Sequence, residues 1–276
     1  SMEKMIWFDD KKILKWNKEF FSISGGVVKY DNNIPVVDRL FNKQRFESLF
    51  GKSRVKNEEV TQLHKDIASS LQQHTENVIF EIINHAIRLT GIEKVCIAGG
   101  VAQNSVANGK IINRTNATAL YIPSAGHDAG ISMGAAQYEY FHNQSNKRVA
   151  PLFDANLGCS FTNEQIKSII TQNHLQSEYM TDDILFRYVA EQIANEKVVG
   201  FFDGKAEFGP RALGSRSILA DPRNKNAQQL LNEKIKKRES FRPFAPSILE
   251  EYGAEFFEDY QFTPFTTAFP SATSVD

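Results

Sequence analysis

The sequence predicts an α/β protein whose first part is built around a parallel sheet. Two observations carry this prediction: a long amphipathic helical pattern leads into a short apolar strand and a glycine turn, and a helix, a second strand and a second glycine turn follow. Parallel strands need crossover segments of this kind. We therefore expect both glycine turns at the edge of the sheet where the strands end.

The long helical pattern covers residues 58–90. Its apolar side chains recur mostly three and four residues apart, Asn57 can cap its start, and Gly91 can end it. Residues 1–57 lack a sustained pattern and are predicted to be irregular, apart from β-like runs at 5–8 and 26–30. This first segment carries no functional expectation of its own.

Two short strands and the turns after them complete the first part. Residues 94–98 and 119–122 are apolar runs typical of buried strands. Residues 101–112 have a helical pattern between the strands, and residues 124–130 form the second turn. The helix that follows is rich in small residues, which allows it to pack closely on a sheet.

A polar linker over residues 141–156 separates a second part from the first. We place the domain boundary near Ala150, so that residues 1–150 and 151–276 form two domains. The elements expected in the second domain are helices that begin after Thr162 and Thr181, strands over 198–203 and 217–220, a helix near 226–235 and an extended segment over 241–249.

Composition and charge are those of an ordinary globular protein. The 276 residues (31.2 kDa) are 41% hydrophobic and 24% charged, which excludes a disordered or fibrous chain. A net charge of −1 argues against nucleic acid held by bulk electrostatics. No apolar stretch approaches the roughly 18 residues of a membrane span, and no signal peptide is evident. Cys96 and Cys159 form neither a disulfide framework nor a metal spacing, so the cytoplasm is the expected compartment.

The first glycine turn, Gly99-Gly100, lets backbone amides approach phosphate oxygens at the start of a helix. Asn104 lies one turn further along, where its side chain could face a nucleotide. A tight turn without a ligand is an equal alternative for a lone glycine pair. The turn is a candidate nucleotide site with that alternative open.

The second glycine turn contains His127 and Asp128. Asp128 can cap the following helix or, through its carboxylate oxygens, hold a metal ion or a metal-bound phosphate. His127 is interpreted as a solvated loop residue. Either interpretation of Asp128 places it at the edge where open α/β sheets bind ligands.

The densest group of candidate residues lies in the second domain, in the glycine-rich segment 201–217. Lys205, Arg211 and Arg216 occur there between residues that form tight turns, and such cations suit a polyanion such as a nucleotide or an acyl phosphate. Further cations follow at Arg223, Lys234, Lys236, Lys237, Arg238 and Arg242. A solvated basic helix end is an equal alternative for residues 234–238. RNA is a minor alternative, because few aromatic residues interleave with the cations.

The sequence contains no nucleophile triad, no paired His or Cys metal spacing and no Walker-type motif. Catalysis by any of these groups is therefore not expected. Positioning and charge stabilisation are the chemistry that the candidate residues support.

Four segments form longer signatures: Ala-Gly-Gly-Val-Ala-Gln-Asn at 98–104, Pro-Ser-Ala-Gly-His-Asp-Ala-Gly at 123–130, Glu-Phe-Gly-Pro-Arg-Ala-Leu-Gly-Ser-Arg at 207–216, and Lys-Arg-Glu-Ser-Phe-Arg-Pro-Phe-Ala-Pro at 237–246. They resemble the O-carbamoyltransferases of nodulation-factor and antibiotic biosynthesis. The resemblance runs in order from about residue 61 to residue 257, and the third signature is highly specific.

The resemblance implies a fold and an activity. The fold is half of an actin-like, sugar-kinase-type ATPase domain in residues 1–150, followed by part of a YrdC-like α/β domain in residues 151–276. The activity is carbamoyl transfer: ATP and carbamoyl phosphate form carbamoyl-adenylate, and a hydroxyl of a sugar or natural-product acceptor then receives the carbamoyl group. The implied cofactors are ATP and Mg²⁺, with iron or another divalent metal as an alternative.

The resemblance also implies roles for residues and partners. Gly99, Gly100 and Asn104 would bind substrate or cofactor in the transfer site, where Asp128 would be a metal ligand. In the activation site, Lys205, Arg211 and Arg216 would be catalytic, and Arg223, Arg238 and Arg242 would bind phosphate and carbamoyl groups. The expected partners are carbamoyl phosphate and a small-molecule acceptor, without a membrane or nucleic acid, and a homodimer is a compatible assembly.

The sequence departs from the family in two respects. Residues 1–57 contain no paired-histidine metal motif, and no Asn-Thr-Ser-Phe-Asn stretch follows the last signature. We therefore expect an internal fragment or a truncated member. The alternatives are a non-catalytic nucleotide or carbamoyl-phosphate-binding fragment that needs a partner chain, and a sugar-kinase-like enzyme.

Overall fold

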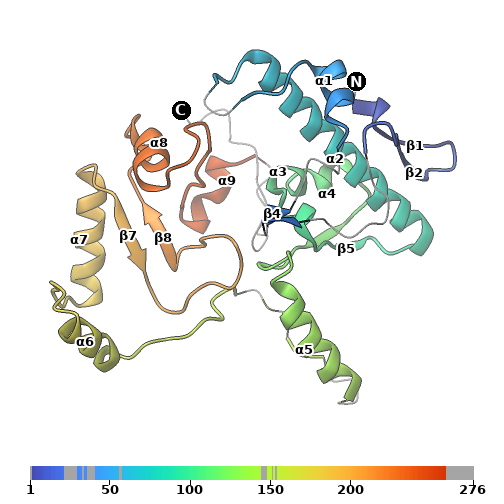
Figure 1. Ribbon diagram of the computed structural model, residues 1–276. Coiled ribbons are helices and arrows are strands. Elements are labelled where there is room, and N and C mark those ends of the chain that lie inside the picture. Colours follow the sequence, from blue (N-terminus) through green and yellow to red (C-terminus); the bar gives the residue numbers. More distant parts are fainter. Residues whose placement is uncertain are drawn as a thin grey trace. The chain divides into compact units, whose positions relative to one another are not determined.

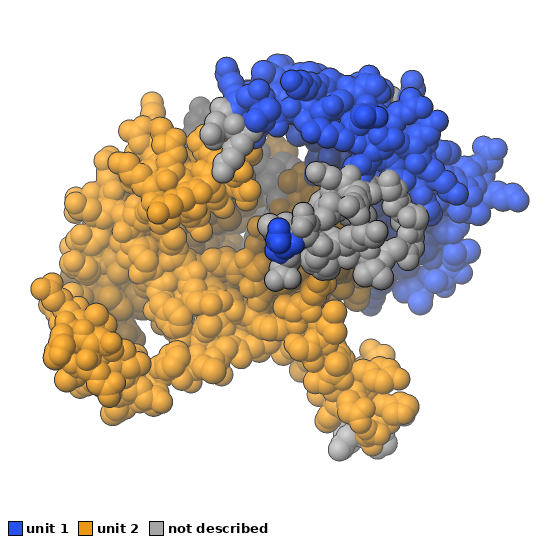
Figure 2. All heavy atoms as spheres, viewed as in Figure 1, with its two compact units in different colours: residues 1–95, 110–119 blue, residues 96–109, 120–276 orange. Residues whose placement is uncertain are grey.

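The computed structural model describes residues 2–21, 30–32, 34–35, 41–55, 58–143, 148–150, 152 and 154–258. Helices and strands are mixed along the chain, as an α/β protein requires (Figure 1). The chain divides into two units, residues 1–95 with 110–119 and residues 96–109 with 120–276 (Figure 2). The domain boundary near Ala150 stays a prediction.

A small hairpin opens the first unit after a 3-10 turn, η1 (Met2–Lys4). Strand β1 (Ile6–Phe8) pairs antiparallel with β2 (Leu14–Trp16), which confirms the β-like run predicted at 5–8. The Asp9 carboxylate holds the turn, because its Oδ1 accepts hydrogen bonds from the backbone N–H groups of Lys11 (3.0 Å) and Ile13 (2.8 Å). Strands β3 (Tyr30–Asp31) and β4 (Ile34–Pro35) also pair antiparallel, and the rest of the run predicted at 26–30 lies outside the described residues.

Helix α1 (Lys43–Phe50) corrects the prediction that this stretch is irregular. The Asn42 side chain caps it by accepting from the backbone N–H of Arg45 (3.2 Å). Phe46 packs edge-on against Phe20, with 5.5 Å between the ring centres. A helix of two turns is too short for apolar periodicity to reveal it, so its packing on Phe20 decides its existence.

Helix α2 (Gln62–Thr90) is the long helix that the sequence predicts, but it begins four residues later than residue 58. Thr61 and His64 form a reciprocal cap at its start, and the predicted cap Asn57 lies outside the described residues. Gly91 ends the helix as predicted: its φ of 68° is left-handed, and its N–H donates to the Ile87 carbonyl (2.8 Å).

The parallel sheet is confirmed by the pairing of β5 (Lys94–Cys96) with β6 (Ala119–Tyr121). Backbone hydrogen bonds join Thr118 to Glu93 and Ile97 to Tyr121, each 3.0 Å long, so the two strands run in the same direction. Helix α5 (Gly130–Asn143) follows the second strand.

The single helix predicted over residues 101–112 is wrong. Three short turns occupy this stretch: η3 (Gly100–Gln103), α3 (Ser105–Asn108) and α4 (Ile111–Arg114). Asn104 interrupts the helical path, because its ψ of 84° is not helical and its side chain accepts from the backbone N–H of Ala107 (3.2 Å). Asparagine competes with the helix by bonding to nearby backbone in this way.

The remaining elements match the predictions closely. Helices α6 (Asn163–Gln172) and α7 (Asp182–Ala194) begin directly after Thr162 and Thr181. Strands β7 (Val199–Phe202) and β8 (Arg216–Leu219) pair antiparallel. Then come α8 (Ala227–Leu230), the π-helical turn η4 (Leu231–Ile235), η5 (Glu250–Tyr252) and α9 (Gly253–Phe256). Within the described ranges, no helix is both long and apolar enough to cross a membrane.

Candidate functional site

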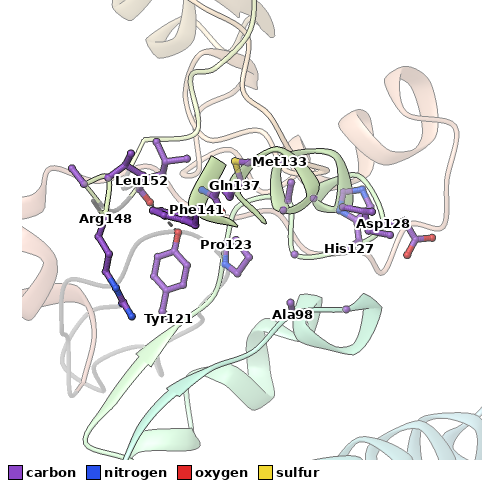
Figure 3. A pocket seen from close by; sticks show the side chains of 18 residues that line it. Ala98, Tyr121, Pro123, His127, Asp128, Met133, Gln137, Phe141, Arg148 and Leu152 are labelled. Carbon is purple, nitrogen blue, oxygen red and sulfur yellow. Dashed lines mark hydrogen bonds between the residues drawn. The ribbon is translucent and has the colours of Figure 1, made fainter. Parts of the chain in front are cut away.

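A pocket of about 840 Å³ lies where the chain leaves strands β5 and β6. We call it the strand-end pocket; Ala98, Gly99, Gly126, His127, Asp128 and part of α5 line it (Figure 3). Tyr121, Phe141 and Arg148 gather on one side, and the Tyr121 hydroxyl donates to the Leu152 carbonyl (3.0 Å). The volume is in the range of small-molecule and cofactor sites.

The two predicted glycine turns meet in this pocket. The backbone N–H of Gly99 donates to the carbonyl of Gly126 at 2.5 Å, and both residues line the pocket. Gly100 and Asn104 are not among its lining residues, and the Asn104 side chain caps α3. Of the three residues predicted to bind nucleotide there, the structure places Gly99 at the pocket wall.

Asp128 and His127 both line the pocket but differ in environment. Asp128 is exposed, and its side chain makes no hydrogen bond to any described residue, so it does not cap α5. His127 is partly buried, and its buried Nδ1 has no hydrogen-bond partner in the described part of the chain. His127 is therefore less solvated than the sequence suggests.

A metal ion at Asp128 needs further ligands. Among the residues that the structure describes, no three His, Cys, Asp or Glu side chains form a group that could hold a metal ion. The described residues therefore do not fit a complete metal centre. Asp128 stays a predicted ligand.

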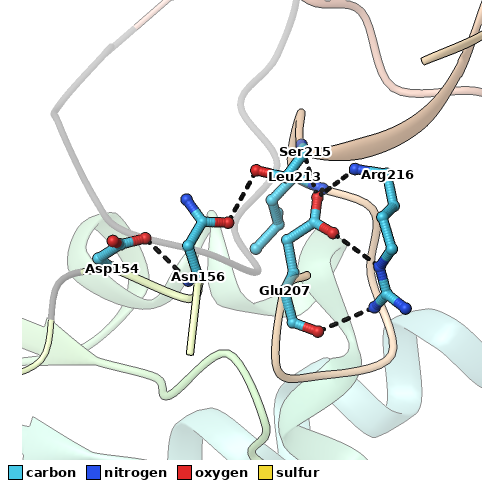
Figure 4. Close-up of polar contacts among 6 residues, drawn as sticks. All are labelled: Asp154, Asn156, Glu207, Leu213, Ser215 and Arg216. Carbon is cyan, nitrogen blue, oxygen red and sulfur yellow. Dashed lines mark hydrogen bonds and ion pairs between the residues drawn. The ribbon is translucent and has the colours of Figure 1, made fainter. Parts of the chain in front are cut away.

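The glycine-rich segment is organised by one carboxylate, that of Glu207 (Figure 4). Its Oε1 accepts from the backbone N–H groups of Leu213 (2.9 Å), Ser215 (2.8 Å) and Arg216 (3.0 Å). The Arg216 guanidinium donates to Oε2 (3.1 Å) and to the Glu207 carbonyl (2.8 Å). We call residues 207–216 the Glu207 loop. Its shape depends on a side chain that is 1% exposed.

The surroundings of Glu207 keep it ionised. Burial raises the pKa of Glu207, but the hydrogen bonds from the Leu213 and Arg216 backbone and from the Arg216 guanidinium outweigh it and lower the pKa to about 2. Glu207 is the residue that the sequence analysis missed. A lone acidic residue at the start of a loop rich in glycine and arginine is the signal that could have identified it.

The six cations that the resemblance assigns to the activation site fall into two groups. Four are bound to side chains: Arg216 to Glu207, Arg223 to Asp221 (2.6 Å), Arg238 to Asn232 (2.7 Å) and Arg242 to Glu239 (2.8 Å). Lys205 and Arg211 are exposed and have no acidic partner among the described residues. Arg211 donates one long hydrogen bond, to the Gln103 carbonyl (3.3 Å). Of these six, Lys205 and Arg211 are the two whose side chains are not bound to another described side chain.

The Glu207 loop packs on the turns that border the strand-end pocket. The Ser124 hydroxyl donates to the Phe208 carbonyl (2.8 Å), and Arg211 reaches Gln103 at the first glycine turn. The structure thus brings the Glu207 loop, which carries Arg211, into contact with Ser124 and Gln103, which are close in the sequence to the predicted transfer-site residues.

Gly209→Ala should loosen this contact. Gly209 has a left-handed φ of 142°, and a Cβ atom there would come within 2.4 Å of the Ser124 carbonyl oxygen. We expect the substitution to lower the free energy of unfolding by roughly 2 kcal/mol, from strain and the displaced backbone. Urea unfolding measures the loss, with Gly134→Ala as the control because open space surrounds a Cβ at that position. Equal stability of the two variants would contradict the close approach.

Comparison with known families decides the identity of the chain. Residues 11–137 match the family model described as carbamoyltransferase N-terminus, and residues 190–274 match carbamoyltransferase C-terminus. The chain belongs to the carbamoyltransferase family. The match starts at residue 11, so the relation to the family extends into the first segment, beyond the range over which the sequence analysis detected it.

Individual relatives are similar to this chain over most of its length. The chain is 42% identical to nodulation protein NolO of Bradyrhizobium diazoefficiens over 204 residues, 72% of this chain and 36% of the relative. It is 42% identical to nodulation protein NolNO of Sinorhizobium fredii over 202 residues, 72% of this chain and 29% of the relative. An uncharacterized Synechocystis protein, sll1178, is 43% identical over 80% of this chain and 37% of its own length. The chain thus spans about a third of the length of these curated relatives.

Proposed function

We propose that this member of the carbamoyltransferase family takes part in transferring a carbamoyl group from carbamoyl phosphate to a hydroxyl of a sugar or natural-product acceptor. The observation that carries the proposal is the placement of Lys205 and Arg211. Both cations are exposed in or beside the Glu207 loop, and Arg211 donates a hydrogen bond to the carbonyl of Gln103, four residues after Gly99 of the strand-end pocket. Family membership and the nodulation relatives support the same chemistry.

The proposed reaction has two stages, both driven by positioning and charge. Carbamoyl phosphate is hydrolysed to carbamate and phosphate, and a carbamate oxygen attacks the α-phosphorus of ATP, so that pyrophosphate leaves and carbamoyl-adenylate forms. Lys205 and Arg211 neutralise the charge that accumulates on the phosphate oxygens. The acceptor hydroxyl oxygen then attacks the carbamoyl carbon, AMP leaves and the hydroxyl proton passes to solvent.

The strand-end pocket is the proposed place of the adenylate. Its volume suits a ligand of that size, and Arg148 and His127 offer polar groups in an otherwise largely apolar lining. ATP would enter as its Mg²⁺ complex, and no step is assigned to a resident metal. The actin-like and YrdC-like domain types are part of this proposal.

A second candidate is a binding fragment that acts only with a partner chain. The same pocket and cations would bind ATP or carbamoyl phosphate, but turnover would need residues from elsewhere.

Pyrophosphate release separates the two candidates. The purified chain is given ATP and Mg²⁺ with carbamoyl phosphate, and the matched control replaces carbamoyl phosphate with acetyl phosphate. Release that depends on carbamoyl phosphate is the expected result and would place adenylate formation within these residues. A folded sample that binds carbamoyl phosphate without releasing pyrophosphate would favour the binding fragment.

A further inference from the structure

A second preorganised loop follows α8, away from the Glu207 loop in the sequence. Asn232 lies in the π-helical turn η4 and is 0% exposed. Its Nδ2 donates to the carbonyl oxygens of Ser240 (3.0 Å) and Arg242 (2.9 Å), and its Oδ1 accepts from Nε of Arg238 (2.7 Å). The buried side-chain amide of Asn232 therefore makes hydrogen bonds to Arg238, Ser240 and Arg242 in the loop over residues 236–242. Turns of the π type occur frequently at functional sites.

Arg238 is the member of this loop whose position is most restricted. Its backbone N–H donates to the Asn232 carbonyl (2.9 Å), and its guanidinium lies 4.8 Å from the centre of the Phe244 ring. The Nε–H of Arg238 donates to Asn232 Oδ1. No described residue accepts a hydrogen bond from the two terminal nitrogens of Arg238. Two parallel N–H donors of this kind match the oxygens of a phosphate group.

The residue before Arg238 adopts an uncommon backbone conformation. Lys237 has a φ of 47°, which residues other than glycine rarely adopt. Such a conformation persists only when its surroundings enforce it. Backbone hydrogen bonds flank Lys237 on both sides, because the Lys236 N–H donates to the Leu231 carbonyl (2.8 Å) and the Arg238 N–H donates to the Asn232 carbonyl (2.9 Å). Lys237 is exposed, so it adds a second cation next to Arg238 in the sequence.

We propose that Asn232 is a positioning residue that presents the terminal nitrogens of Arg238 to a phosphate group. The inference rests on the proposed function, in which Arg238 binds a phosphate-containing substrate. Without the Asn232 amide, the arginine side chain must lose its rotamer freedom when the ligand binds, and affinity falls accordingly.

Calorimetric titration of the full chain with carbamoyl phosphate tests this role. We expect Arg238→Ala and Asn232→Ala each to raise Kd by about tenfold or more, the factor typical of hydrogen bonds to charged groups. Asn232→Leu has a similar size but can neither accept from Arg238 nor donate to Ser240 and Arg242, and it replaces the alanine variant if that does not fold. Gln229→Ala is the matched control and should keep the wild-type Kd, because the hydrogen bonds that its side chain makes within the described ranges go to Glu233.

A double variant separates positioning from a general structural role. If Asn232 acts through Arg238, Asn232→Ala with Arg238→Ala binds no more weakly than Arg238→Ala alone. Additive losses, or wild-type binding by the Asn232 variants, would overturn the inference while leaving the phosphate site intact. Wild-type binding by Arg238→Ala, or no binding by the unaltered chain, would overturn the proposed phosphate site and the inference together.

Discussion

Glu207→Gln is expected to lower the free energy of unfolding by roughly 3 kcal/mol, the range seen when one partner of a buried ion pair is removed. The substitution keeps the size of the side chain but removes the charge that holds three backbone N–H groups and the Arg216 guanidinium. Urea unfolding measures the loss. Amide hydrogen exchange at Leu213, Ser215 and Arg216 should accelerate, because their common acceptor is weakened.

Glu178→Gln is the control for this substitution, because Glu178 is exposed. Its stability should stay within about 0.5 kcal/mol of the wild type. A Glu207→Gln variant that is as stable as Glu178→Gln, with unchanged exchange in the Glu207 loop, would show that the carboxylate does not organise that loop.

The same carboxylate makes stability depend on pH in one direction. The pKa of Glu207 is about 2 in the folded chain against an ordinary value of 4.5, so its contribution is complete above about pH 4.5 and is lost as the pH falls through about 2. The difference in unfolding free energy between wild type and Glu207→Gln should therefore shrink between about pH 6 and about pH 3.5. A difference that grows on acidification would contradict the lowered pKa.

Arg211→Ala is expected to reduce carbamoyl-phosphate-dependent pyrophosphate release by a factor of about a hundred or more, since a lost charge-stabilising donor costs on that order. Stability should change little, because Arg211 is exposed and makes a single long hydrogen bond, to the Gln103 carbonyl (3.3 Å). The measurement is the rate of pyrophosphate release at saturating ATP.

Two further variants make the Arg211 result specific. Arg211→Lys keeps the charge but loses the planar pair of donors, and it should recover only part of the rate. Arg187→Ala removes an exposed arginine of α7 that does not line the strand-end pocket, and it should leave the rate unchanged. An unaltered rate in Arg211→Ala would remove this residue from the proposed site.

Elements that depend on local chemistry are predictable from the sequence. The helix starts after Thr162 and Thr181 and the left-handed Gly91 are decided within one turn of the helix, and each lies where it was predicted, although the Thr162 side chain caps its helix and the Thr181 side chain makes no capping hydrogen bond. The parallel pairing of the two strands is also predictable from the sequence. A helical segment between two apolar strand segments leaves few other ways to place the two strands in one sheet. Helix α1 was missed because only its packing on Phe20 reveals it.

The candidate site shows the limit of prediction more clearly. The sequence analysis identified where cations are dense, and it expected Lys205, Arg211 and Arg216 to be catalytic and Arg223 to bind phosphate or carbamoyl groups. In the structure, Arg216 forms an ion pair with Glu207, and Arg223 forms one with Asp221. Lys205 and Arg211 are exposed and have no acidic partner among the described residues. An ion pair of side chains depends on the path of the chain between them, which a pattern of residue types does not encode.

By itself, the sequence determined the family, the α/β class and the location of the glycine turns and cationic segments, because these follow from residue types and short-range backbone preferences. Only the tertiary structure decided that Glu207 organises its loop, that Asn232 holds Arg238, and that the Glu207 loop packs on the turns of the strand-end pocket. The physical reason is that a buried polar group must find its partners, and folding decides which groups are within reach.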